Sequence, residues 1–162
     1  MNTKIFKVAI AVAMFVLCIK SSAQTEFIEK YEDDKTASYV YVSKVMLNMI
    51  GGNQYFMHDL NTMKMGQKLA GKLNSIQIIS TENADTSAKL RADVSDAVKN
   101  HNFEIIMKAN DEGEKVTIYF LEGKKDSNIL MLTTEDKETN LIAFAGDFTA
   151  AELTDFVAKA SK

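Results

Sequence analysis

The chain has 162 residues, 46% of them hydrophobic and 25% charged, which is the composition of one globular domain with an ordinary core. Its 19 basic and 22 acidic residues leave a net charge of -3. An acidic chain without a basic stripe is a poor partner for nucleic acid or for an anionic membrane surface, so we expect neither.

The first 23 residues have the layout of a cleaved secretory signal peptide. Two lysines precede an uncharged apolar run over residues 8–19, and Ser21 and Ala23 are small at the positions that a signal peptidase recognises. A membrane span needs roughly 20 apolar residues, so this shorter run predicts no stable transmembrane span in the mature chain. We therefore expect residues 24–162 to form a single exported domain, periplasmic or secreted.

Cys18 is the only cysteine, and it lies inside this first segment. A lipoprotein signal places a small residue directly before the lipidated cysteine, whereas Leu17 is large, so we favour cleavage after Ala23 over lipidation. The mature chain would then contain no cysteine and could form no disulfide. Its 16 basic and 22 acidic residues would give it a charge of -6.

The first half of the mature chain predicts alternating helices and strands. In chain order we expect a short helix within residues 26–34, a strand over 37–43, a helix over 44–50 that two glycines stop, and a strand over 73–80. Asn53–Lys72 has a mixed pattern, for which we expect a loop with at most one irregular helix.

One long amphipathic helix follows, capped by Asp85 or Thr86 through the free amides of its first turn. Its apolar stripe comprises Leu90, Val94, Ala97, Val98 and His101. A stripe on one side only predicts that this helix packs one face against a sheet.

The second half predicts an antiparallel meander that ends in a helix. The expected strands cover residues 103–108, 116–121, 128–133 and 141–145. Gly113 can take the left-handed conformation that closes the first hairpin. Thr149 and Glu152 form a capping box at the start of a terminal helix over residues 149–160.

Two of these strands are apolar on both faces. Residues 129–132 and 141–144 do not alternate between apolar and polar, as a strand exposed on one side should. The second face must be covered by helices of the same chain, by a second copy, or by an apolar ligand or partner, and the sequence leaves these three open. The candidate interaction surface comprises Leu130, Leu132, Ile142 and Phe144.

Residues 39–47, 73–82, 103–107 and 141–148 together resemble domain-of-unknown-function family 4252 (DUF4252), over most of the mature chain. The resemblance implies a small exported protein of a Gram-negative, Bacteroides-type bacterium, and no catalytic residue is established for the family. Some members resemble lipoproteins, a pattern from which Leu17 departs. Because the matching segments are mainly core strands, the resemblance concerns the fold more than an activity.

No catalytic constellation stands out in the sequence. A nucleophile–base hydrolase needs a histidine, and the mature chain has only His58 and His101. His101 is explained by its place at a helix end, where exposed carbonyls favour a cation, and no Gly-x-Ser-x-Gly elbow accompanies His58. The carboxylates fall in turns and on polar helix faces, and no tryptophan offers a platform for a sugar. We expect no enzyme and no cofactor.

Soft ligands cluster within residues 46–65, where they are Met46, Met49, Met57, His58, Met63 and Met65. Thioethers and imidazole suit copper(I). Methionine is also an adaptable core residue, and helical spacing accounts for Met46 and Met49. The remaining metal-site candidates are Met57, His58, Met63 and Met65.

The sequence thus predicts an α+β domain with a mainly antiparallel sheet of about five to six strands and amphipathic helices packed on it. For function we expect a non-enzymatic interaction module of the bacterial envelope, acting through a protein partner or by self-association as a homodimer. The alternative is a soluble periplasmic carrier or sensor of a small ligand or copper(I), which would use residues 46–65.

Overall fold

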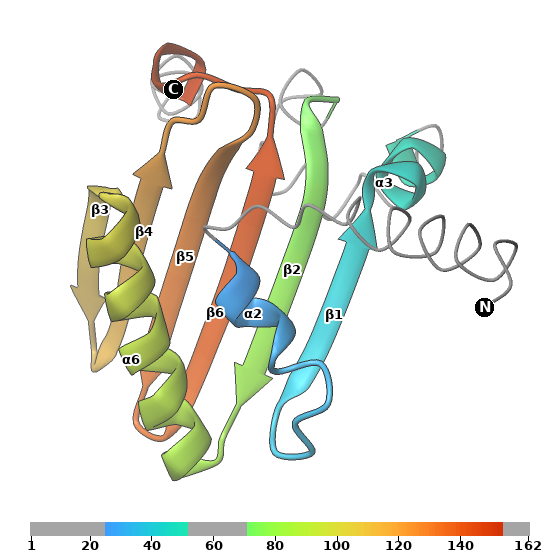
Figure 1. Ribbon diagram of the computed structural model, residues 1–162. Coiled ribbons are helices and arrows are strands. Elements are labelled where there is room, and N and C mark those ends of the chain that lie inside the picture. Colours follow the sequence, from blue (N-terminus) through green and yellow to red (C-terminus); the bar gives the residue numbers. More distant parts are fainter. Residues whose placement is uncertain (1–24, 52–70, 154–162) are drawn as a thin grey trace, which may run out of the picture.

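The computed structural model describes residues 25–51 and 71–153 (Figure 1). In chain order the described elements are α2 (Glu26–Glu29), β1 (Ser38–Ser43), α3 (Lys44–Gly51), β2 (Leu73–Thr81), α6 (Ala84–His101), β3 (Glu104–Asp111), β4 (Glu114–Leu121), β5 (Ser127–Glu135) and β6 (Glu138–Gly146). Residues 150–153 begin a further helix. The predicted α+β class is confirmed.

The six strands form one sheet in the order β1-β2-β6-β5-β4-β3, and every neighbouring pair is antiparallel. β3 to β6 are the predicted meander, and β6 pairs with β2, which joins the two halves of the chain. β1 and β3 are therefore the two edge strands.

α6 crosses one face of this sheet, because it connects β2 near one edge to β3 at the other (Figure 1). Three residues of the predicted stripe, Leu90, Val94 and Ala97, are buried beneath it, and α2 lies on the same face. We call this the covered face. Its core comprises Ile28, Tyr31, Ile79, Leu90, Val94, Phe103, Leu130, Leu141 and Ala143.

The two ends of α6 are capped by asparagines. Asn83 has extended backbone (φ -74°, ψ 122°), and its side chain accepts hydrogen bonds from the backbone N–H groups of Asp85 and Thr86, at 3.1 and 3.0 Å. The prediction that Asp85 or Thr86 caps the helix was wrong, because these residues supply the amides rather than the acceptor. Asn102 ends the helix in the left-handed conformation (φ 58°), just after His101.

The hairpin between β3 and β4 turns at Glu112 and Gly113, which have φ values of 47° and 103°. Two left-handed residues in a two-residue loop match the twist of the flanking strands, so the prediction for Gly113 is confirmed. β3 begins one residue later than predicted and extends to Asp111, because it pairs with β4 up to this turn.

Most of the mixed segment Asn53–Lys72, and the predicted terminal helix beyond Leu153, lie outside the described residues. Within residues 25–51 and 71–153, no helix has both the length and the apolar character needed to cross a membrane.

Candidate interaction surface

The sheet face opposite α6, which we call the open face, carries a row of apolar side chains from edge to edge. Directly opposed residues of antiparallel strands lie on the same face, so the pairing register identifies the row. It runs through Val40, Ile78, Ile142, Met131, Ile118 and Met107, one residue from each strand. We call these six residues the central row.

The central row is uncharged and partly exposed along its whole length. Val40 and Met107, at the two sheet edges, are both 45% exposed, and the four residues between them are half-buried. A surface of this kind can bury apolar atoms of another molecule, at roughly 25 cal/mol for each Å² removed from water. The chemistry that the open face offers is therefore apolar contact.

One end of the open face is closed by the chain itself. Beside the central row, a second row comprises Val42, Ile76, Phe144, Ile129 and Phe120. Leu47 of α3, together with Phe148 and Leu153 after β6, packs against this second row in a small core of its own. The described part of the chain thus covers a strip of the open face at the end where α3 and the C-terminal residues lie (Figure 1).

Gly146, the last residue of β6, allows Phe148 to reach this small core. A Cβ at Gly146 would lie 2.5 Å from the carbonyl oxygen of Lys72 and 2.8 Å from the Phe148 ring, so no side chain fits. The Phe148 ring packs against Phe120, with ring centroids 6.3 Å apart.

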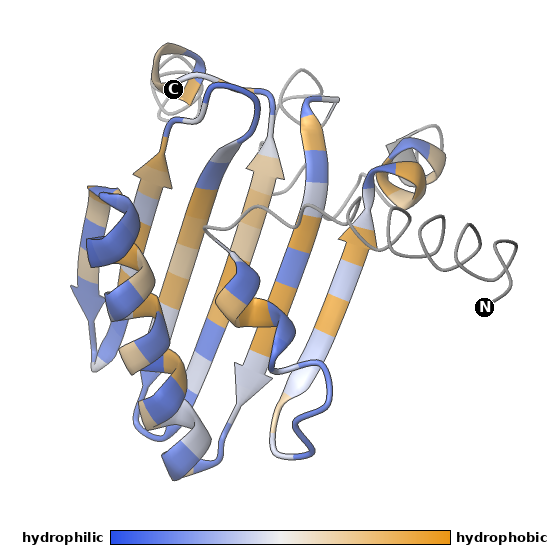
Figure 2. Cartoon of the chain, viewed as in Figure 1, coloured by the Kyte–Doolittle hydropathy of each residue, from blue (hydrophilic) through white to orange (hydrophobic). Residues whose placement is uncertain are grey.

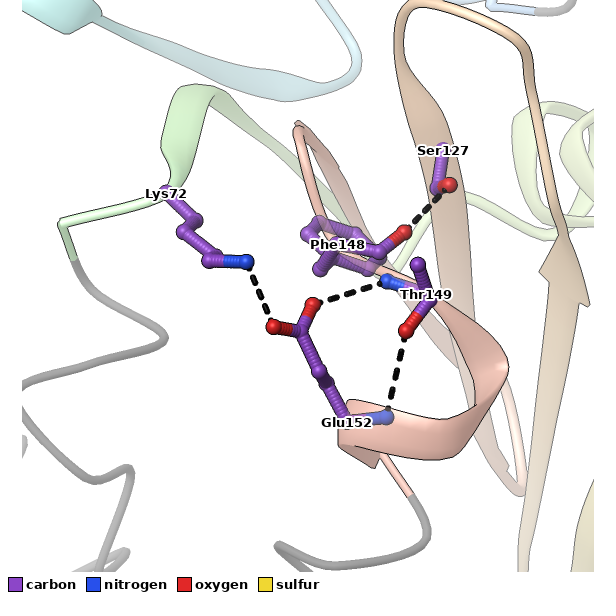
Figure 3. Close-up of polar contacts among 5 residues, drawn as sticks. All are labelled: Lys72, Ser127, Phe148, Thr149 and Glu152. Atoms are coloured by element: carbon purple, nitrogen blue, oxygen red, sulfur yellow. Dashed lines mark hydrogen bonds and ion pairs between the residues drawn. The ribbon is translucent and has the colours of Figure 1, made fainter.

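The capping box predicted from the sequence holds this end in place (Figure 3). The backbone N–H of Glu152 donates to Thr149 Oγ1 at 3.3 Å, and that of Thr149 donates to Glu152 Oε2 at 3.1 Å. Lys72 Nζ contacts Glu152 Oε1 at 2.5 Å, and this hydrogen bond with the ammonium lowers the pKa of the Glu152 carboxyl. Ser127 Oγ donates to the Phe148 carbonyl at 2.6 Å, which ties β5 to the same turn.

The four residues of the predicted interaction surface lie on opposite faces. Leu130 is fully buried in the core of the covered face, and Leu132 packs against that core. Ile142 lies in the central row of the open face, and Phe144 lies beside it against the small core. Of the four, Ile142 and Phe144 therefore belong to the candidate surface that the structure brings together.

The metal candidates Met57, His58, Met63 and Met65 lie outside the described residues. Within the described ranges, no three His, Cys, Asp or Glu side chains are grouped as they would be around a metal ion. Met46 and Met49 lie on α3 with 49% and 69% of their surface exposed, so at these positions they do not fill a core.

Polar contacts on the covered face fasten α6 to the residues that follow α2 and to the sheet. The Tyr31 hydroxyl donates to Asp93 Oδ2, and Lys30 Nζ lies 2.6 Å from the same oxygen, which ties α2 to α6. Burial, and next the hydrogen bond to Asp93, raise the pKa of Tyr31 well above its ordinary value of 10.0. Arg91 of α6 donates to Ser87 Oγ of the same helix and to Thr139 Oγ1 of β6, at 3.0 and 3.3 Å, which ties the helix to the sheet.

Asn128 is the one buried residue of the described chain whose side-chain oxygen and nitrogen both have no hydrogen-bond partner. It lies on the covered face, opposite Leu121 and Ala145. A buried amide without a partner costs stability, and no pattern in the sequence marks it. At the opposite end of the sheet, a shallow hollow is lined by Glu82, Glu135, Asp136, Lys137 and Glu138. These residues belong to the turn between β5 and β6 and to the position directly after β2.

Comparison with known proteins gives one match. The family model described as "Domain of unknown function (DUF4252)" matches residues 31–156, which include all six strands and α6. No curated protein and no solved structure matches the chain. Since the model covers more than half of its residues, the chain belongs to the DUF4252 family.

Proposed function

We propose that this protein is a non-enzymatic interaction module of the bacterial envelope, exported through its N-terminal segment, and that it binds a protein partner or a second copy through the open face. The apolar central row carries the proposal. An edge-to-edge row of six partly exposed apolar side chains is larger than the scattered apolar residues that soluble proteins normally expose.

The covered end of the open face supports the same function. The capping box, Gly146 and the Phe148–Phe120 contact hold the rim of the surface in a defined position. A binding surface on a rigid sheet loses little conformational entropy when a partner docks, so more of the burial energy appears as affinity.

The test is site-specific photo-crosslinking in the bacterium that makes the protein. A benzoylphenylalanine in place of Met131 would lie at the centre of the open face, whereas one in place of Ala88 would lie on the exposed side of α6. We expect a discrete crosslinked species in the envelope fraction from position 131 and none from position 88.

The mass of the crosslinked species identifies the partner class. A product of twice the chain mass indicates self-association through the open face, and any other discrete mass indicates a different protein. The proposal is rejected if position 131 gives no product, or gives the same products as position 88.

A further inference from the structure

The two edges of the sheet are protected to different degrees. At one edge, β3 contains a bulge between Ile105 and Met107, and its sequence includes the charged residues Glu104, Lys108 and Asp111. Bulges and charges are the devices by which natural proteins keep an edge strand from pairing with another chain. β3 is therefore a guarded edge, although several of its apolar side chains are exposed.

At the other edge, β1 has none of these devices. Its six residues pair with β2 without a bulge, and the strand contains neither a charged residue nor a proline. Val40 and Tyr41 are 45% and 56% exposed. Figure 2 shows the contrast, since β1 has no strongly hydrophilic residue whereas β3 has several.

β1 is also complementary to itself. Tyr39 and Tyr41 lie on the covered face, whereas Val40 and Val42 lie on the open face. In an antiparallel pair of two β1 strands related by a two-fold axis at Tyr41, Val40 of each copy meets Val42 of the other, and the two Tyr41 side chains meet. Cross-strand pairs of aromatic and β-branched residues each contribute roughly 0.2–1 kcal/mol.

Charges at the two ends of β1 fit the same arrangement. The acidic residues Glu32, Asp33 and Asp34 precede β1, and Lys44 directly follows it. An antiparallel pair brings the start of one β1 beside the end of the other, so Lys44 of each copy approaches the acidic turn of its partner. Among the described residues the Lys44 ammonium donates to Asn74 Oδ1 at 2.8 Å, and its two further N–H groups can donate to a carboxylate.

α3 supplies additional apolar surface at this edge. A stable interface buries about 1,200–2,000 Å² in total, more than a pair of six-residue strands provides alone. α3 follows β1 without a gap, and its side chains Val45, Met46 and Met49 are 69%, 49% and 69% exposed. α3 contacts β1 and β2 and lies at the end of β1 (Figure 1), so a second copy paired with β1 would come close to this helix.

We propose that β1 pairs antiparallel with β1 of a second copy, which joins two six-stranded sheets into one continuous sheet. This inference goes beyond the proposed function, because it concerns the β1 edge rather than the open face. The two proposals are separable, since Tyr41 of β1 lies on the covered face and its substitution leaves the open face unchanged.

Two matched variants test the proposal. Tyr41→Lys and Ile105→Lys place the same charge on the two edge strands, on side chains that are 56% and 50% exposed and that do not lie on the open face. The full chain, processed by its own host, is analysed by native mass spectrometry and light scattering over a range of concentrations. We expect the wild type and Ile105→Lys to be dimers, and Tyr41→Lys to dissociate with a dimer dissociation constant raised about tenfold or more. Circular dichroism checks that both variants are folded.

A cysteine variant gives a second measurement, in which the dimer is crosslinked instead of dissociated. Tyr41→Cys places a thiol opposite its own copy at the two-fold axis, where strand spacing allows a disulfide. We expect disulfide-linked dimers of Tyr41→Cys after oxidation. We expect no disulfide-linked dimers of Ile105→Cys or of the wild type, and the wild type is the control for Cys18. A monomeric wild type overturns the proposal whether or not the open face crosslinks, and so does dissociation caused by Ile105→Lys instead of Tyr41→Lys.

Discussion

The covered face and the open face are built from the same six strands, yet in the described part of the chain the main core lies on the covered face and a smaller core closes one end of the open face. Leu130 and Leu141 on the covered face are fully buried, whereas their chain neighbours Met131 and Ile142 on the open face are half-buried. The side chains are similar in size and polarity, so composition does not cause the difference. The difference in burial comes from the path of α6 across one face, because a single crossover helix can cover only one side of a sheet.

The largest expected difference between the faces is in the cost of deleting a side chain. Leu130→Ala should destabilise the protein by about 2–5 kcal/mol, because it leaves a cavity under α2 and α6. Ile142→Ala should cost about 1 kcal/mol, because water already reaches this side chain. Urea unfolding measures the loss of stability in both variants, provided that the unfolding free energy falls with urea concentration at the same slope in each. An equal loss for the two variants would mean that the open face is as closely packed as the covered face.

A smaller effect of opposite sign is expected at Asn128 on the covered face. Asn128→Leu should stabilise the protein by about 1 kcal/mol, because leucine has the same branching and removes two unpaired polar atoms. The matched control is Asn74→Leu, which should destabilise, since the Asn74 side chain is bonded to Lys44 and Asp126. Thermal unfolding measures both, and a loss of stability in Asn128→Leu would contradict the expectation.

The hydrogen bond from the Tyr31 hydroxyl to Asp93 of α6 predicts a pH dependence of stability. Burial and the hydrogen bond to Asp93 raise the pKa of Tyr31 in the folded protein, whereas the unfolded chain ionises near the ordinary value of 10.0. The stabilisation is therefore complete below pH 10 and is lost as the pH rises above it. Tyr31→Phe should cost about 1 kcal/mol at pH 8 and flatten the loss between pH 9 and 11.

Urea unfolding across that pH range tests the sign of the Tyr31 effect. Tyr41→Phe is the matched control, because it removes a hydroxyl from an exposed side chain. A Tyr31→Phe variant whose stability falls as steeply as that of the wild type would show that Tyr31 does not carry the alkaline loss.

The smallest effect is expected at the capping box that holds one end of the open face. Thr149→Ala removes the acceptor for the Glu152 amide and should cost about 0.5–1 kcal/mol. Thr117→Ala, a strand position outside the box, is the control for loss of a threonine methyl and hydroxyl. Hydrogen exchange of the Glu152 and Leu153 amides measures the local effect, and unchanged exchange in Thr149→Ala would contradict it.

Much of the fold could be predicted because its signals are local. The left-handed turn at Gly113, the capping box at Thr149 and the buried stripe of α6 each depend on residues close together in the chain. The predicted cap of α6 was wrong by two or three residues, because several hydrogen-bond acceptors follow one another in the sequence and only the backbone conformation of Asn83 selects one of them.

The candidate surface could be predicted only in part. The doubly apolar segments 129–132 and 141–144 indicated two buried faces, and period-two alternation assigns Leu130 and Ile142 to different sides of the sheet once the register is known. Nothing local indicates which side a helix will cover. The unpaired amide of Asn128 was missed for the same reason, since its surroundings come from strands distant in the sequence.

The chain's own sequence thus specifies the strands, their alternation, the turns and the helix caps, because these depend on backbone preferences and on neighbours a few residues away. The pairing of β6 with β2, the side that α6 covers, and the contrast between the bulged β3 edge and the regular β1 edge depend on contacts between distant segments. The open face and the free β1 edge arise at this second level, because an apolar strand residue becomes core or surface according to what packs over it.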